Sequence, residues 1–150
     1  ALVNPGGVRI DRLPQGPIRI MDIYQLDPFG NELVVTKLTG NEINSLMLAA
    51  YSIDDKTPLY PSGIRTKLRT DPNGNLAEVD LLTVDGIPLP MDQTYSVAMN
   101  SYMTQVYKYQ HNDPGQSLFI TSADALIAYL RDIKNVRSYK GEKRIQIDRQ

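Results

Sequence analysis

Three short stretches of the chain combine side chains that could bind a small polar ligand. The first, Asn4-Pro5-Gly6-Gly7-Val8-Arg9, lies near the start. The asparagine amide can donate to and accept from the edge of a purine, and the guanidinium offers donors that match phosphate oxygens. Two adjacent glycines permit a positive φ and let a ligand approach the backbone. The same pattern also fits a tight turn followed by a solvated arginine, so both interpretations stay open.

The other two stretches each place an aromatic ring beside a turn. Phe29 stands in Asp27-Pro28-Phe29-Gly30-Asn31, and Tyr102 follows Asn100-Ser101. Loop aromatics are candidates for stacking on a base, and each such stack is worth about 1–3 kcal/mol. Two rings from separate loops could therefore enclose a flat heterocycle across a gap of about its thickness. Alternatively, Phe29 folds back over the core and Tyr102 packs inward from the first turn of a helix.

The residues expected of a catalytic centre are scarce. The chain has no cysteine and one histidine, His111, in a polar loop, whereas a catalytic metal needs clustered His, Asp, Glu or Cys ligands. Two Gly-Asn-Glu triplets, at residues 30–32 and 40–42, lack a following histidine, and helix capping explains the second. No serine lies in a nucleophile elbow. We predict that the chain has no catalytic residue and no metal site, and that alone it is inactive.

The composition is that of one globular domain. The 150 residues are 41% hydrophobic and 22% charged. A net charge of −1 without a basic stripe argues against binding to nucleic acid. No apolar run approaches the ~20 residues of a membrane span, and no signal peptide opens the chain. The first residues, Ala1-Leu2-Val3-Asn4, have the pattern of a strand. We therefore expect a further segment upstream of them.

Hydrophobic periodicity predicts several helices. One runs from about Ile20 to the residues before Pro28, and one follows a Thr-x-x-Glu capping box at Thr39. The apolar face of this second helix is expected to be Ile43, Leu46, Met47, Ala50 and Tyr51. A further helix begins near Tyr102. The last is capped by Thr121 or Ser122, with Ala123, Leu126, Ile127, Leu130 and Ile133 on its face.

Strands are predicted between these helices. Alternation or β-branched residues mark residues 2–3, 33–36, 64–69, 79–84, 95–99 and 144–147. The turn signal Asp71-Pro72-Asn73-Gly74 joins two of them as a hairpin. Strands and helices follow one another without a regular βαβ rhythm. The prediction is therefore a single α+β domain over residues 1–150, with hairpins and a mixed sheet packed against helices.

Taken in order, these motifs resemble a known family. Asn-x-Gly-Gly-Val-Arg, then Pro-Phe-Gly-Asn, then an aromatic after the strand at Tyr95 resemble the C-terminal domain of the 5'-nucleotidase family, which includes UDP-sugar hydrolases and 2',3'-cyclic-nucleotide phosphodiesterases. Residues 35–42, Pro61-Ser62-Gly63 and residues 84–89 support the resemblance, which covers nearly the whole chain.

The resemblance implies a function and a set of substrate-binding residues. In the family, this domain grips the nucleoside, while a preceding metallophosphoesterase domain holds two metal ions. The implied roles are phosphate contact for Arg9, a place beside the substrate for Asn4, a base sandwich for Phe29 and Tyr102, a hydrogen bond at the base edge for Asn31, and a place in the pocket wall for Gly63.

The resemblance also implies partners and a location. The ligand would be a nucleotide or nucleoside, and the protein partner a metallophosphoesterase domain on the same or a separate chain. This chain would bind no cofactor, because the divalent metals belong to the missing N-terminal domain. The location would be periplasmic, cell-surface or secreted.

The sequence departs from the family pattern after Tyr102. The family usually continues with Gly-Gly-Asp-Gly, whose aspartate holds the ribose hydroxyls, whereas residues 103–108 here are Met-Thr-Gln-Val-Tyr-Lys. We do not expect Asp113, in Asp113-Pro114-Gly115, to replace that carboxylate. The alternative function is a non-catalytic accessory module with a degraded pocket, which docks to a metallophosphoesterase chain. A third alternative, a carbohydrate-binding or adhesion domain, is supported only by the general mixture of helices and strands.

Overall fold

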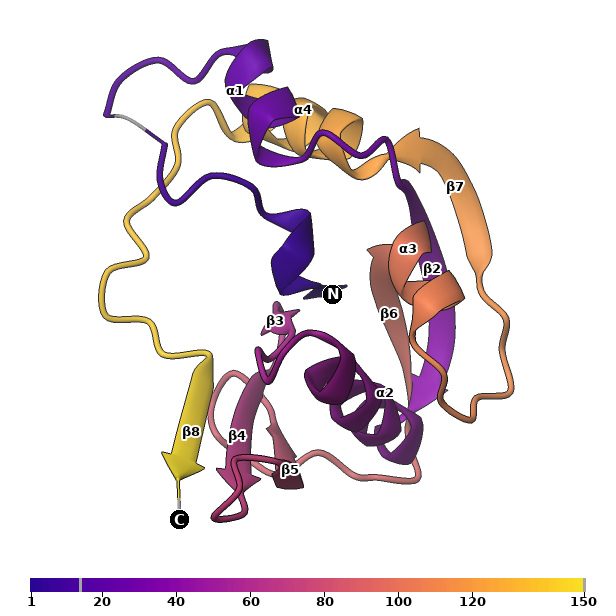
Figure 1. The fold of residues 1–150 in the computed structure, drawn as a ribbon. Helices are drawn as coiled ribbons and strands as arrows, with labels where there is room; N and C mark the ends of the chain where they lie inside the picture. Colours follow the sequence, from indigo (N-terminus) through magenta and orange to yellow (C-terminus); the bar gives the residue numbers. More distant parts are fainter. Residues whose placement is uncertain (14, 150) are drawn as a thin grey trace.

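The computed structural model describes residues 1–13 and 15–149. Short strands and helices alternate irregularly along the chain (Figure 1). In chain order they are β1 (Leu2–Val3), the 3₁₀ turn η1 (Pro5–Gly7), α1 (Ile20–Leu26), β2 (Glu32–Thr39), α2 (Gly40–Ile53), β3 (Tyr60–Pro61), β4 (Arg65–Thr70), β5 (Leu76–Leu82), β6 (Thr94–Asn100), α3 (Ser101–Val106), β7 (Gln116–Thr121), α4 (Ser122–Ile133) and β8 (Ile145–Arg149).

Two small sheets form the body of the domain. One has the order β6-β2-β7 and is antiparallel, and the other has the order β5-β4-β8. In the second sheet β4 pairs antiparallel with β5 and parallel with β8, so this sheet is mixed. β1 and β3 form a separate two-residue pair. The predicted α+β class with a hairpin and a mixed sheet is confirmed.

Helix α2 lies between the two sheets, while α1 and α4 pack together at one end of the domain (Figure 1). All five residues predicted for the apolar face of α2 are buried, and Leu46 and Ala50 are fully inaccessible. Four of them, all but Tyr51, pack with Leu38 of β2, Leu68 of β4 and Met99 of β6 in one core. The sheets are therefore held together through α2. The predicted face of α4 is only half-buried apart from Ala123, because α4 packs against the short helix α1.

The start of α2 has the predicted capping box. The Glu42 amide donates to the Thr39 hydroxyl at 3.2 Å, and the Thr39 amide donates to the Glu42 carboxylate at 2.7 Å. This second hydrogen bond lowers the pKa of Glu42 below its ordinary value. The box therefore satisfies two backbone donors that would otherwise lack partners at the helix start.

Thr39→Ala is expected to lower the free energy of unfolding by about 1 kcal/mol, because it removes the cap oxygen. The stabilisation from Glu42 is present above the pKa of unfolded glutamate, about 4.3, and is lost as the pH falls through the lower folded-state pKa. Urea unfolding at pH 7 and pH 3 measures both effects. In Glu42→Gln, the loss of stability between these pH values should be smaller than in the wild type. An equal loss would contradict the assignment.

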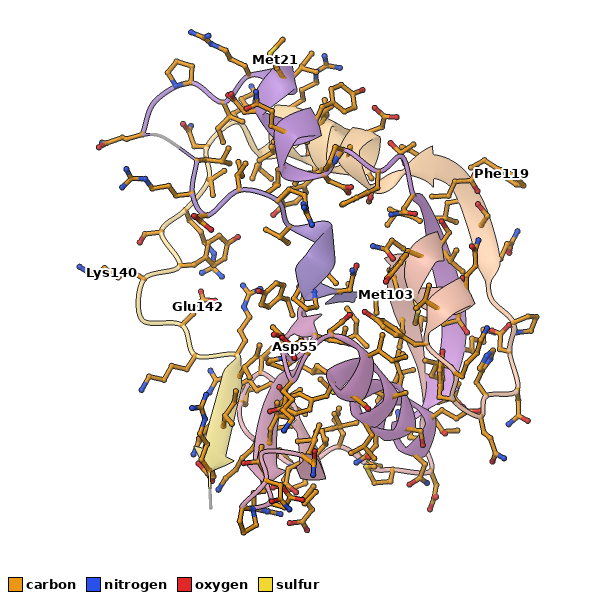
Figure 2. All side chains as sticks on the ribbon, in the orientation of Figure 1. Met21, Asp55, Met103, Phe119, Lys140 and Glu142 are labelled. Carbon is orange, nitrogen blue, oxygen red and sulfur yellow. The ribbon has the colours of Figure 1, made fainter. Side chains whose placement is uncertain are left out.

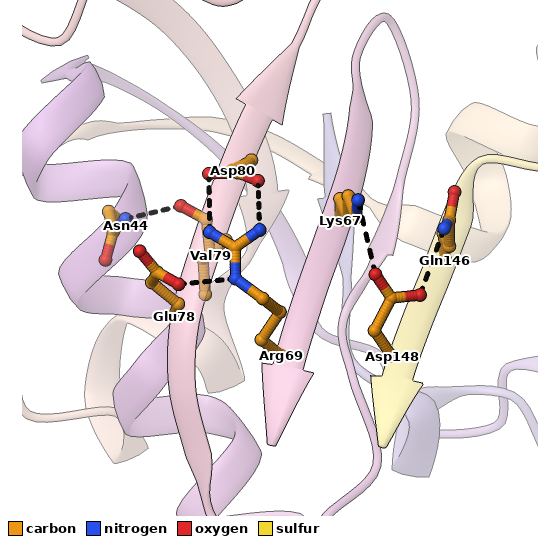
Figure 3. Close-up of polar contacts among 8 residues, drawn as sticks. All are labelled: Asn44, Lys67, Arg69, Glu78, Val79, Asp80, Gln146 and Asp148. Atoms are coloured by element: carbon orange, nitrogen blue, oxygen red, sulfur yellow. Dashed lines mark hydrogen bonds and ion pairs between the residues drawn. The ribbon is translucent and has the colours of Figure 1, made fainter. Parts of the chain in front are cut away.

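The hairpin β4–β5 shows the predicted alternation. Thr66, Leu68 and Thr70 are buried, while the basic residues between them reach acidic partners on neighbouring strands (Figure 3). Arg69 contacts both Glu78 and Asp80 on β5, and Lys67 Nζ lies 3.2 Å from Asp148 on β8. These side chains are partly solvated, so each pair contributes little to stability.

Strand β7 was not predicted from the sequence. Its hydrophobic residues do not mark a buried face, because the side chains of Leu118 and Phe119 are 50% and 87% exposed. Its pairing with β2 shifts register, and Phe119 has a φ of 53°. Figure 2 shows Phe119 projecting from β7, in contrast to Met103, which points into the interior from α3. In the part of the chain that the structure describes, no helix is long and apolar enough to cross a membrane.

Candidate functional site

The three stretches predicted to bind a ligand meet at one open pocket of about 380 Å³, within the size range of small-molecule sites. Its lining residues are Asn4, Gly6, Gly7, Arg9, Phe29, Asn31, Asp54 and Tyr102. Five of the six residues predicted to bind substrate are among them, and the exception is Gly63. A larger groove of about 750 Å³ lies between α1 and α4, but it shares no residue with the predicted site.

The floor of the pocket depends on a pair of buried asparagines. Asn4 and Asn100 are 4% and 8% exposed, and the Asn100 amide donates to Asn4 Oδ1 at 2.9 Å. The oxygen of Asn4 is thus already engaged, and within the described residues its amide nitrogen has no protein acceptor. Asn4 can therefore offer a ligand a donor, whereas the sequence alone allowed either polarity.

The two adjacent glycines serve close packing and do not use the positive φ that the sequence permits. Residues 5–7 form a 3₁₀ turn, and neither glycine has a positive φ. A Cβ on Gly7 would lie 2.9 Å from Asn4 Oδ1, so a side chain there would displace the buried asparagine pair. A small residue is required at Gly7 because Asn4 lies directly behind it.

The Phe29 ring is held at the pocket by a well-anchored loop. The Ser122 hydroxyl at the start of α4 donates to Asp27, and the Ser122 amide donates to the Asn31 carbonyl at 2.8 Å. Gly30, with a φ of 65°, makes the turn between them. The side chain of Phe29 is 50% exposed, so it is not folded over the core.

Arg9 lies beside this ring. Its backbone amide donates to the carbonyl of Leu26, the last residue of α1, at 2.9 Å. Its guanidinium carbon lies 5.7 Å from the centroid of the Phe29 ring, a distance at which a cation–π interaction is favourable. The first and second stretches therefore form a connected wall of the pocket.

Tyr102 belongs to a second group of side chains. It is 38% exposed in the first turn of α3, and Asn100 caps that helix by accepting from the Met103 amide at 3.0 Å. The buried ring of Tyr107 meets Tyr102 edge to face, with centroids 6.1 Å apart. The Tyr107 hydroxyl donates to Asp54, and burial, together with this hydrogen bond, raises the pKa of Tyr107 well above its ordinary value. The phenol therefore stays protonated.

Gly63 lies elsewhere. With a φ of 83° it lines a separate hollow of about 210 Å³ next to Leu2, Ile43 and Tyr95. The structure does not bring it together with the other five predicted residues. Gly63 was assigned to the pocket because it precedes a strand, as the corresponding glycine does in the family. That position in the sequence does not determine which pocket the residue lines.

Asp113 and His111 do not line the pocket. The carboxylate of Asp113 accepts from the backbone amides of Gly115 and Lys37, and these hydrogen bonds hold its pKa below the ordinary value. His111 stacks on Tyr109, with ring centroids 4.6 Å apart. Among the described residues, no group of three or more His, Cys, Asp or Glu side chains could hold a metal ion.

Asp54 is the residue of the pocket that the sequence analysis missed. It follows the last residue of α2, and it lies at the pocket where the Tyr107 hydroxyl, just after α3, donates to it. No local pattern in the sequence marks it. Among the described lining residues it is the one carboxylate.

The fold and the pocket define an α+β domain with an open aromatic pocket and no metal-binding cluster in its described part. The chain belongs to the 5'-nucleotidase C-terminal domain family, whose model matches residues 1–108. It is 29% identical over 153 aligned residues to a probable 5'-nucleotidase of Treponema pallidum, covering 91% of this chain and 26% of the relative. It also shares 34% identity over 110 residues with the cell wall protein Lmo0130 of Listeria monocytogenes, covering 69% of this chain and 14% of that protein.

A solved structure shows the same fold. The 5'-nucleotidase precursor of Thermus thermophilus superimposes with a TM-score of 0.80 at 30% identity, covering 97% of this chain and 31% of that chain. The present chain thus spans less than a third of the length of each of these relatives.

Proposed function

We propose that the chain is the nucleotide-recognition domain of a 5'-nucleotidase-like phosphohydrolase. Phe29 and Tyr102 enclose the base, and Arg9 binds the phosphate. The observation that carries this proposal is that all three side chains, drawn from distant parts of the sequence, line one open pocket. Both rings keep substantial exposed surface, which a stacked base would cover.

Arg9 suits the phosphate role because its donors are free. Within the described chain it makes no ion pair, and the contact recorded for its guanidinium is the one with the Phe29 ring. A fork of donors next to a stacking ring is an arrangement that recognises a base and an oxyanion together. Asn4 and Asn31 supply further polar groups at the same pocket for the edges of the ligand.

Hydrolysis is assigned to a separate two-metal domain, on the same polypeptide or on another. The relatives that carry the name 5'-nucleotidase are much longer than this chain, and the described residues here contain no metal-binding cluster. A two-metal site would activate the attacking water, while this domain would contribute positioning of the substrate and a rotation between domains. The name of the Listeria relative supports a location outside the cytoplasm.

Phe29→Ala is expected to weaken AMP binding by about 5- to 150-fold, because it removes one stacking surface worth about 1–3 kcal/mol. Calorimetric titration of AMP and adenosine into both proteins measures the change. Phe119→Ala is a matched control, since Phe119 is the other phenylalanine of the chain, is 87% exposed and does not line the pocket. Equal affinities of Phe29→Ala and wild type, or no binding to wild type, would contradict the proposal.

The competing function is the accessory module without a nucleotide pocket. The large groove between α1 and α4 favours it, because apolar residues such as Ile20 and Val136 remain about half exposed there. In that case the wild type would bind no nucleoside but would co-elute with a metallophosphoesterase chain in size-exclusion chromatography.

A further inference from the structure

The carboxylate of Asp54 is held in a defined orientation at the pocket. Its backbone amide donates to the carbonyl of Ala50 at 2.8 Å and closes α2. One carboxylate oxygen accepts the hydroxyl hydrogen of Tyr107. Within the described residues no protein group donates to the other oxygen, Oδ1. Asp54 therefore offers the pocket one free, negatively charged acceptor.

Tyr107 fixes this acceptor relative to the aromatic wall. The tyrosine is 1% exposed, so its ring has little freedom, and it contacts both Asp54 and the Tyr102 ring. Because the buried phenol stays protonated, it donates to Asp54 throughout the neutral pH range. Asp54 and Tyr102 therefore form a single rigid unit through Tyr107.

The charges in the pocket are divided between two groups of residues. Arg9 lies against Phe29, whereas Asp54 is linked through Tyr107 to Tyr102. A carboxylate repels a phosphate and accepts hydrogen bonds from hydroxyl groups. A ligand that satisfies both groups has an anion at the Arg9 side and neutral hydroxyl donors at the Asp54 side.

On this geometry, and resting on the proposed function, we propose that Asp54 determines specificity by accepting hydrogen bonds from the ribose hydroxyls of the bound nucleotide. The pocket then prefers ribonucleoside 5'-phosphates to deoxyribonucleoside 5'-phosphates. It rejects ligands without these hydroxyls because a charged acceptor is left without its donor in the complex. No residue of the sequence motifs supplies this function, since Asp54 lies outside all three stretches.

The test compares three ligands on the unaltered chain: AMP, 2'-deoxy-AMP and 3'-deoxy-AMP, titrated by calorimetry. AMP is expected to bind about 10-fold more tightly than at least one deoxy analogue, as for loss of a hydrogen bond to a charged group. In Asp54→Asn this preference should fall to about 3-fold or less, because a neutral amide oxygen is a weaker acceptor.

Asp55→Asn is the matched control. Asp55, labelled in Figure 2, is the next residue along the chain. It is exposed and does not line the pocket. Its φ of 49° suits asparagine, so the substitution adds no backbone strain. This variant should keep the full preference for AMP.

The outcomes separate this inference from the proposed function. Equal affinities of the unaltered chain for all three ligands, with Phe29→Ala still weakening AMP binding, would overturn the role of Asp54 alone. No AMP binding to the unaltered chain would overturn both. Thermal unfolding of Asp54→Asn checks that it folds, and if it does not, the ligand comparison on the unaltered chain decides the question.

Discussion

Replacing Asn100 with alanine is expected to lower the free energy of unfolding by about 2–4 kcal/mol and to weaken AMP binding as well. One carboxamide makes two hydrogen bonds in the interior. Its oxygen caps α3 through the Met103 amide at 3.0 Å, and its nitrogen donates to Asn4 at 2.9 Å. Alanine would leave both partners buried without this hydrogen bond. Asn4, which forms the floor of the pocket, would also lose the contact that holds it in place.

Urea unfolding and calorimetric titration of the same proteins measure these two effects. Asn100→Asp is the informative companion, because it keeps the cap acceptor and removes the donor to Asn4. Since its carboxylate would face the acceptor Asn4 Oδ1, AMP binding should weaken as in Asn100→Ala although the α3 cap is kept. If the alanine variant loses under about 1 kcal/mol, the asparagine pair is not the structural link between α3 and the pocket floor.

Replacing Tyr107 with alanine is expected to lower the free energy of unfolding by about 3–5 kcal/mol. The ring is 1% exposed and belongs to the main hydrophobic core, so its removal leaves a cavity. The variant also removes the edge-to-face contact with Tyr102 and the hydrogen bond to Asp54. AMP binding should therefore weaken even where the variant is still folded.

Tyr107→Phe separates packing from hydrogen bonding. It keeps the ring and its contact with Tyr102, and it loses only the donor to Asp54, so about 1 kcal/mol of stability should be lost. Chemical unfolding of the two variants gives the comparison. If phenylalanine costs as much as alanine, the hydrogen bond rather than the buried ring supports this region.

Local patterns were sufficient to predict the elements of the fold that have a clear hydrophobic period or a clear turn sequence. The α2 face, from Ile43 to Tyr51, follows the helical repeat, and the hairpin around residues 71–74 has an unambiguous turn sequence. β7 has neither, because its pairing with β2 is irregular and its apolar side chains face solvent. Its formation depends on the edge of β2, which a local pattern cannot reveal.

The candidate site could be predicted to the extent that its residues lie in recognisable motifs. Asn4, Arg9, Phe29, Asn31 and Tyr102 stand beside turns, where side chains reach the surface, and all five line the pocket. Asp54 and Tyr107 have no such signal. They meet across 53 residues of sequence because the tertiary structure brings the end of α2 to the end of α3, which no local pattern indicates.

The last two strands also bear on where this domain ends. The family model matches residues 1–108, yet β7 and β8 both come later and complete different sheets. The segment that connects α4 to β8 runs along the length of the molecule (Figure 1). A polypeptide cut at residue 108 would expose the backbone of β2 and β4 to pairing with other chains, and self-association would compete with folding. The residues after 108 are thus part of the folded unit, because each three-stranded sheet takes one of its strands from them.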